Sequence, residues 1–421
     1  MLPSLIEIVP PGPAGRAVIA IPGSKSITNR ALILAALAQG EVVLQGALWS
    51  EDTQVMVECL RKLGFSVNVE PDPSEEANRT IRVLGAGGNI PAGGSISAPL
   101  ELFVGNAGTA ARFLTAFLCL GQGCYRLSGI PRMHERPQAA LVAALQELGY
   151  RVDTVNDRLP LVVHGAGPRP GRCRVSVSES SQFASALLLG SRQGGWSIEI
   201  DGANPDELPY VEMTRQLIEA FPNRGGTFAI EPDTSSGSYF WAASTLLGGG
   251  RVQVTDWPQT HWQFDTRFPQ YLPLPAVISR ERDLGDSIMT AIVLAPMAPR
   301  PTVFTDLGRL RVQECERVLA LKTELRKCGA RVEEVADTLT VHPSQLHGAE
   351  IETYNDHRMA MCFATLGLKV PGIRIRNPAC VKKTFPNYFR KLAAPPPHGL
   401  GAGVLDALGG ERLAWEKLGA E

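Results

Sequence analysis

The sequence lacks the features that mark metal-binding, secreted and membrane proteins. Its eight cysteines, among 421 residues, form no Cys-x-x-Cys pair and no Cys/His cluster, so neither zinc nor a disulfide framework is indicated. No apolar run approaches the roughly 20 residues of a membrane span, and the start MLPSLIEIVPPG lacks the pattern of a signal peptide. The formal net charge is -1, which gives no field that draws nucleic acid or membranes. We expect a cytoplasmic protein with no metal ion, nucleic-acid partner or membrane partner.

A chain of this length predicts two or more domains, and internal repeats show how they are built. One pattern occurs at residues 60–67, 145–152 and 325–332. It begins with a leucine in the last turn of an expected helix, continues with a glycine and ends with a valine. Glycine just past a helix end is a common C-terminal signal, and the valine begins a strand. A repeating α/β architecture follows.

A second element recurs six times: small or polar residues that lead into a helix that is apolar nearly all round. Such helices are expected to be buried, and Ser, Asn and Asp at their starts are good N-caps. Since a helix N-terminus carries about half a positive charge and free N–H groups, several such starts facing one place would bind a strongly anionic ligand. The six begin at Ser24, Asn106, Ser180, Ser235, Asp286 and Asn355.

Charged residues gather near several of these starts. PRMHERP places Arg132 and Arg136 between two prolines, and RLRVQECER predicts a helix that begins near Arg309, with Glu314 and Arg317 as an i,i+3 pair. A plain helical ion pair explains the second segment equally well. Arg358 opposes the helix dipole in YNDHRMAM, so an anion is expected nearby.

Taken together, these motifs resemble those of the 5-enolpyruvylshikimate-3-phosphate synthases. PGSKSITNRAL, LFVGNAGTAARFL, PRMHERP, SSQF, DSIMT, ERVLALKTELRKCGA, YNDHRMAM and KKTFPNYF occur in the family's order, between about residues 10 and 392. The resemblance implies the enolpyruvyl transferase fold, a two-domain inside-out α/β barrel of repeated βαβαββ units whose helix N-termini face an interdomain cleft. It also implies a first domain of residues 1–22 plus 233–393 and a second of 23–232. Residues 394–421 are left as a linker and an amphipathic tail helix.

The resemblance also implies the reaction and its site residues. The enolpyruvyl group of phosphoenolpyruvate would pass to the 5-hydroxyl of shikimate 3-phosphate, in the shikimate pathway to chorismate and aromatic amino acids, with no cofactor and as a monomer. Asp286, Glu314 and Lys25 would be catalytic. Phosphoenolpyruvate would be bound by Lys25, Asn106, Gly108, Arg132, Gln182, Arg317, Arg358 and Lys383. Shikimate 3-phosphate would be bound by Lys25, Ser26, Arg30, Ser180, Ser181, Gln182, Asp286, Arg309 and Gln313. Glyphosate would take the place of phosphoenolpyruvate, with room left by Gly108.

The sequence departs from the family at the position expected for the 3-phosphate. Glu207 stands where the family has serine, Gln313 where it has lysine and Arg309 where it has asparagine. We expect Arg309 to restore the missing charge, one helical turn from Gln313. The stretch between Trp257 and Asp286 is also short and proline-rich, which predicts that one unit is truncated.

Two alternatives remain open from the sequence. The altered phosphate positions suit a sister enolpyruvyl transferase with a different phosphorylated acceptor, such as a nucleotide. The UDP-N-acetylglucosamine enolpyruvyl transferase is disfavoured, because its loop cysteine has no counterpart near Pro131. The second alternative is a non-catalytic binding protein of the same fold, against which the retained Lys25, Asp286 and Lys383 argue.

Overall fold

The chain folds into two compact α/β units, each built from buried helices packed on small sheets. The computed structural model describes residues 2–13, 15–202 and 207–419. One unit comprises Met1–Pro22 and Pro232–Glu421, and the other comprises Gly23–Glu231; we call them the discontinuous unit and the continuous unit. The sequence predicted unit boundaries between residues 22 and 23 and between 232 and 233. In the structure they lie between 22 and 23 and between 231 and 232. None of the helices in the described ranges is both long and apolar enough to cross a membrane.

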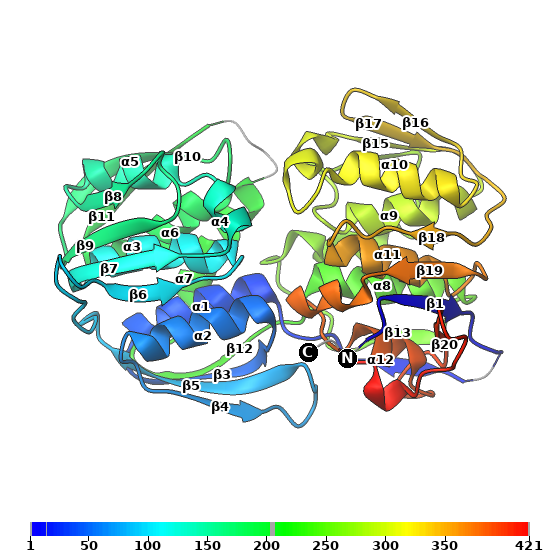
Figure 1. Cartoon of the computed structure of the whole chain (residues 1–421), viewed down its shortest axis with the longest axis horizontal. Coiled ribbons are helices and arrows are strands. Elements are labelled where there is room, and N and C mark those ends of the chain that lie inside the picture. Colours follow the sequence, from blue (N-terminus) through cyan, green and yellow to red (C-terminus); the bar gives the residue numbers. More distant parts are fainter. Residues whose placement is uncertain (1, 14, 203–206, 420–421) are drawn as a thin grey trace. The chain divides into compact units, whose positions relative to one another are not determined.

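The continuous unit contains three sheets (Figure 1). The first has the order β12-β3-β5-β4, the second β6-β7-β9-β8, and the third pairs β10 with β11. In both larger sheets a parallel pair is extended by an antiparallel hairpin. The strands are β3 (Gln39–Leu48), β4 (Val67–Pro71), β5 (Asn78–Ala86), β6 (Leu100–Phe103), β7 (Gln122–Ser128), β8 (Arg151–Thr154), β9 (Leu161–Ala166), β10 (Gly171–Ser176), β11 (Trp196–Asp201) and β12 (Gly226–Ala229).

Three expected helices form the interior of this unit. They are α1 (Lys25–Leu37), α3 (Gly108–Cys119) and α6 (Ser181–Gly194), which contact one another and each pack on a different sheet. The other helices are α2 (Glu51–Lys62), α4 (Pro131–Glu135), α5 (Ala139–Glu147) and α7 (Leu208–Ala220). Gly64 and Gly149 follow α2 and α5 with φ of +100° and +81°, a conformation that glycine adopts without strain. The helix–glycine–strand pattern is therefore confirmed at both positions.

The discontinuous unit repeats this design with different strands. One sheet has the order β14-β15-β17-β16, a second has β18-β19-β1-β20, and β13 pairs with β2. The strands are β1 (Leu5–Val9), β2 (Ala17–Ile19), β13 (Val252–Val254), β14 (Val277–Ser279), β15 (Thr302–Thr305), β16 (Val332–Val335), β17 (Thr338–Val341), β18 (Glu350–Ile351), β19 (Ile373–Arg376) and β20 (Gly403–Asp406). Since β14-β15-β17-β16 has the topology of β6-β7-β9-β8, the internal repeat extends across both units.

The remaining three expected helices pack together in the core of this unit (Figure 1). They are α8 (Thr234–Leu246), α9 (Ile288–Leu294) and α11 (His357–Leu366). In the sequence, α10 (Arg317–Lys327) lies between α9 and α11, and α12 (Tyr388–Ala393) follows α11. Between β13 and β14 there is one 3-10 helix, η1 (Phe264–Tyr271), in place of a helix and a strand pair. The unit expected to be truncated is therefore short in the structure too.

The C-terminal segment differs from its expectation. Instead of a linker and a tail helix, residues 403–406 form β20, which pairs antiparallel with β1. Leu400 and Val404 are buried in the core, and the helical part of the tail is only the 3-10 turn η5 (Trp415–Lys417). Paired strand hydrogen bonds and buried apolar side chains outweigh the helical periodicity of the sequence. The last two residues, 420–421, lie outside the described residues.

Candidate functional site

In the discontinuous unit, Asp286 lies among three arginines just before α9. Its carboxylate is 3.1 Å from Arg358 Nη2, 3.2 Å from Arg280 Nη2 and 3.6 Å from Arg317 Nη1. Arg280 and Arg317 are each only 2% exposed. The structure thus brings together Asp286, Arg317 and Arg358, and it adds Arg280, which lies outside the sequence motifs.

This arrangement sets the protonation state of Asp286. Burial by itself raises the pKa of the carboxyl, but Arg358, Arg317 and Arg280 overcome that effect and hold the pKa well below its usual range. With these contacts in place the carboxylate is a weak base. An anion that competed for the same guanidinium groups would make Asp286 more basic.

A second carboxylate fixes Arg317 from the other side. Asp356 is fully buried and accepts from Arg317 Nε at 2.7 Å and from Nη2 at 3.3 Å. Burial opposes the charge, yet Arg317 keeps the pKa of Asp356 lowered. Gln313 contacts both Asp286 and Arg317: its side-chain N–H donates to Asp286, and its side-chain oxygen accepts from Arg317. Gln313 therefore contacts the acidic cluster through its neutral amide.

The N-terminus of α11 explains how Arg358 is tolerated there. The Asp356 side chain caps the helix by accepting from the Arg358 backbone N–H at 2.8 Å, and the Arg358 guanidinium pairs with Asp286. Its Nη1 also donates to the buried Tyr239 hydroxyl at 3.4 Å. The expected neighbouring anions are thus carboxylates of the chain itself.

Lys383 and Glu314 form a separate ion pair in the same unit. Lys383 is the last residue of the 3-10 helix η4 (Pro378–Lys383). Its ammonium lies 2.7 Å from Glu314 Oε2. The expected partnership of Glu314 with Arg317 is replaced: Arg317 pairs with Asp356 and Asp286. A lysine beside a carboxylate provides both a proton donor and an acceptor.

The helix expected at RLRVQECER is interrupted. Residues 307–312 form the 3-10 helix η3 (Leu307–Val312), and α10 begins only at Arg317 with Glu316 as its cap. Gln313, with φ -90° and ψ -127°, stands between them. The premise that Arg309 and Gln313 share one α-helical face is therefore wrong. Arg309 lies in η3, and Gln313 is the residue that ends this 3-10 helix.

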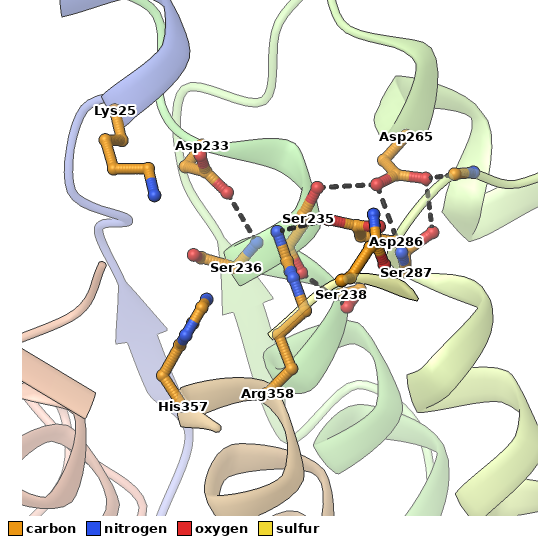
Figure 2. Close-up of polar contacts among 12 residues, drawn as sticks. Lys25, Asp233, Ser235, Ser236, Ser238, Asp265, Asp286, Ser287, His357 and Arg358 are labelled. Carbon is orange, nitrogen blue, oxygen red and sulfur yellow. Dashed lines mark hydrogen bonds and ion pairs between the residues drawn. The ribbon is translucent and has the colours of Figure 1, made fainter. Parts of the chain in front are cut away.

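Asp265 anchors the shortened segment to two helix starts, as Figure 2 shows. Its buried carboxylate accepts from the Ser235 hydroxyl at 2.5 Å, the Ser287 hydroxyl at 2.6 Å, and the backbone N–H groups of Gly285 and Ser287. These contacts fix the residues on both sides of Asp286. Asp265 is a positioning residue that the sequence patterns did not indicate.

In the continuous unit, Lys25 opens α1 and pairs with Asp52 of α2. The distance from Lys25 Nζ to Asp52 Oδ2 is 3.0 Å, and Asp52 is 4% exposed. The partner was not foreseen, because nothing local to SKSITNR points to α2. Ser26 contributes its carbonyl oxygen to Arg30.

The start of α3 brings Asn106 and Gly108 beside an arginine. Arg136 Nη1 donates to the Asn106 carbonyl at 3.2 Å, and a Cβ on Gly108 would lie 2.7 Å from Arg136 Nη2 and 2.9 Å from Arg112 Nη1. A side chain at Gly108 would therefore displace the ends of these two arginine side chains. The buried Asn106 Oδ1 has no hydrogen-bond partner within the described ranges.

Arg132, the arginine expected here, is placed elsewhere. Its side chain is 58% exposed and pairs with Glu135 at 2.5 Å. Both arginines belong to PRMHERP, and the short helix α4 turns Arg136, not Arg132, toward α3. The structure favours Arg136 as the cation of this segment.

The start of α6 is already occupied by a carboxylate. Ser180 caps the helix by accepting from the Gln182 N–H at 3.2 Å, whereas the Ser181 N–H donates to Glu207 Oε2 at 2.6 Å. Glu207 is 5% exposed. Gln182 Oε1 is buried without a hydrogen-bond partner in the part of the chain described.

Arg30 lies beneath this helix start with its guanidinium fully engaged in polar contacts. It donates to Thr214 Oγ1 at 2.7 Å, Ser185 Oγ at 3.1 Å and the Ser26 carbonyl at 2.9 Å. Burial lowers its pKa to about 10, while Tyr210 and Glu207 act in the opposite direction. Arg30 remains charged near neutral pH and is 2% exposed.

Comparison with known proteins places these residues in a family. The chain matches the family described as EPSP synthase (3-phosphoshikimate 1-carboxyvinyltransferase) over residues 11–272 and 276–392. A 3-phosphoshikimate 1-carboxyvinyltransferase of Trichormus variabilis is 39% identical over 418 residues, covering 89% of this chain and 95% of the relative. One of Cupriavidus necator is 40% identical over 438 residues, covering 91% and 98%.

Solved structures show the same fold at lower identity. An EPSP synthase from Acinetobacter baumannii superimposes with a TM-score of 0.75 at 20% identity, covering 95% of this chain and 99% of that one. The enolpyruvyl transferase NikO from Streptomyces tendae gives 0.69 at 16% identity, covering 96% and 99%. The fold is thus shared with both of these proteins.

Proposed function

Because the chain belongs to the EPSP synthase family, we propose that it transfers the enolpyruvyl group of phosphoenolpyruvate to the 5-hydroxyl of shikimate 3-phosphate. This is the step that leads toward chorismate and the aromatic amino acids. We further propose that the protein works as a cytoplasmic monomer with these two small molecules as its substrates.

The reaction needs three proton transfers: one from the acceptor hydroxyl, one to C3 of phosphoenolpyruvate and one back from C3. The acceptor hydroxyl gives up its proton as its oxygen bonds to C2 of phosphoenolpyruvate, and the C3 methylene is protonated. The resulting tetrahedral ketal then loses phosphate as the C3 methyl is deprotonated. Bases, acids and fixed cations are required, since two anionic substrates must be held together.

Asp286 is the proposed base for the acceptor hydroxyl. With Arg317 and Arg358 bound to it, its pKa is too low for that task. Phosphoenolpyruvate carries a carboxylate and a phosphate, and arginine binds both groups through paired N–H donors. Substrate that recruits Arg317 and Arg358 frees Asp286 from part of its counter-charge, so its basicity rises when the proton must be removed.

Glu314 and Lys25 are the proposed groups for proton transfer at C3. The Lys383 ammonium, 2.7 Å from Glu314, stabilises the carboxylate form and contacts the substrate anion. Asp52 holds the ammonium of Lys25. In the continuous unit, Asn106, Gly108, Gln182 and Arg136 are proposed phosphoenolpyruvate contacts, with Arg136 in the place first given to Arg132.

Shikimate 3-phosphate is proposed to contact the α6 start and the residues around Gln313. Ser180 and Ser181 supply hydroxyls and a helix N-terminus for the phosphate, and Ser26 with Arg30 is assigned to the carboxylate. Arg30 is 2% exposed, and its guanidinium donates to the buried hydroxyls of Ser185 and Thr214. Arg309 and Gln313 stay proposed ligands of the phosphate.

The observation that carries the proposal is the cluster of Arg280, Arg317 and Arg358 around Asp286. It combines a carboxylate base with cations suited to an anionic substrate. The test is release of inorganic phosphate from phosphoenolpyruvate by the purified protein, with and without shikimate 3-phosphate. Acceptor-dependent release supports the proposal, and release that does not respond to this acceptor rejects it.

A second candidate function is favoured by one observation. Glu207 occupies the α6 start with a carboxylate, which suits an acceptor that bears a hydroxyl instead of a phosphate at this position. A sister enolpyruvyl transferase would then release phosphate with such an acceptor but not with shikimate 3-phosphate.

A further inference from the structure

Glu207 places a negative charge where the acceptor phosphate is proposed to bind. Its Oε2 accepts the Ser181 N–H at 2.6 Å, in the first turn of α6. That N–H is one of the few helix donors that a bound phosphate oxygen would otherwise take. An oxyanion of the chain itself thus lies against the helix N-terminus.

The surroundings make this position suitable for one anion rather than two. Glu207 is 5% exposed, so water screens it weakly. Arg30 interacts electrostatically with Glu207, and its guanidinium is held by hydroxyl and carbonyl oxygens. A phosphate placed beside Glu207 would compete with it for this interaction and face a like charge at close range.

We propose that Glu207 is an acceptor-specificity residue, whose carboxylate competes with the acceptor's phosphate for the N-terminus of α6. The inference rests on the proposed function. Binding of shikimate 3-phosphate then requires the carboxylate to leave the Ser181 N–H, and the displacement weakens the phosphorylated acceptor but not its unphosphorylated counterpart. The wild type should therefore favour shikimate 3-phosphate over shikimate less strongly than a variant without this carboxylate.

Two substitutions of Glu207 separate the effect of its negative charge from the effect of its side-chain size. Glu207→Gln removes the charge but keeps an oxygen that accepts from the Ser181 N–H, whereas Glu207→Ser also withdraws the side chain. Glu212→Gln is the matched control, because Glu212 is an exposed carboxylate on α7 that accepts from Gln216. Thermal unfolding of each variant establishes that it is folded before binding is measured; if Glu207→Ser does not fold, Glu207→Gln decides.

The readout is equilibrium binding of shikimate 3-phosphate and of shikimate, each measured by calorimetry on the full chain. We expect Glu207→Gln and Glu207→Ser to bind shikimate 3-phosphate at least tenfold more tightly than the wild type, with shikimate binding changed less than twofold. Glu212→Gln should match the wild type for both. Unchanged or weaker binding of shikimate 3-phosphate by the folded Glu207 variants, or no binding by any of the proteins, overturns the inference.

Failure of the inference and failure of the proposed function are distinguishable. Wild-type turnover with shikimate 3-phosphate, together with unchanged binding in the Glu207 variants, leaves the function intact and shows the carboxylate to be a helix cap only. Tighter binding in the variants without wild-type turnover upholds the role of Glu207 and rejects shikimate 3-phosphate as the natural acceptor.

Discussion

Arg358 Nη2 lies 3.1 Å from Asp286 Oδ2, although the two residues come from different repeats of the chain. The pair joins the start of α11 to the segment just before α9, and Arg280 and Arg317 also lie against Asp286. Because the arginines proposed to bind an anionic substrate are paired with the proposed base, we expect substrate binding and activation of Asp286 to be coupled.

Asp286 should be needed for turnover far more than for substrate binding. Asp286→Asn and Asp286→Ala should each lower kcat by about a hundredfold or more. Steady-state kinetics measures this, and circular dichroism checks the fold. Near-normal kcat in Asp286→Asn would assign the carboxylate to charge balance alone.

Arg136 and Arg132 provide a matched pair within one motif. Arg136 lies against Gly108 at the α3 start, whereas Arg132 is exposed and paired with Glu135. Arg136→Ala should raise KM for phosphoenolpyruvate at least tenfold, about 1.4 kcal/mol, and Arg132→Ala less than threefold. The reverse order would restore the assignment made from the sequence.

Arg309 is predicted to bind the acceptor's phosphate despite the break before α10. Arg309→Ala should raise KM for shikimate 3-phosphate at least tenfold, with little change for phosphoenolpyruvate, because a guanidinium binds phosphate through paired donors. Equal KM values in wild type and variant would remove Arg309 from the site while leaving the reaction assigned.

Asp265 should act through the position of Asp286. Asp265→Asn replaces the carboxylate by an amide, whose NH2 group would face the hydroxyl and N–H donors of Ser235, Gly285 and Ser287. We therefore expect a loss of about 2–4 kcal/mol in the free energy of unfolding together with lower kcat. Asp153→Asn is the control, since its ion pairs with Arg151 and His164 lie at the surface and should contribute no more than about 1 kcal/mol. Chemical denaturation of both variants gives the comparison.

Asp356 predicts how stability depends on acid. Its folded pKa lies below the ordinary value of about 3.9, so its contribution is present above that pH and is lost as the pH falls toward the folded pKa. Asp356→Asn should be less stable than the wild type near neutral pH, and the difference should shrink as the pH drops below about 4. A difference that is independent of pH, measured by denaturant unfolding, would contradict the low pKa.

The sequence predicted what depends on local pattern. Glycine after a helix end, as at Gly64 and Gly149, and apolar stretches behind polar caps have local physical causes, so the helices were placed within a few residues. Asp52 comes from another helix, and no periodicity links Lys25 to α2. Arg280 is only six residues from Asp286, but it lies outside the repeated motifs. The two arginines of PRMHERP could not be told apart, because only the turn of α4 decides which one faces α3.

Competing interactions explain the other differences. The tail has an amphipathic pattern, but β1 offers an unpaired edge that β20 takes up. The expected helix before α10 gives way where Gln313 bonds to both Asp286 and Arg317. In both places a tertiary contact outweighs local propensity.

The most direct test of the account is proton NMR of the products formed from phosphoenolpyruvate with a panel of acceptors: shikimate 3-phosphate, shikimate and a nucleotide. The account predicts that the purified protein converts shikimate 3-phosphate into an enol ether, with two new vinyl protons and one phosphate released for each product. Vinyl signals that arise only with another acceptor, or with none of them, would contradict it.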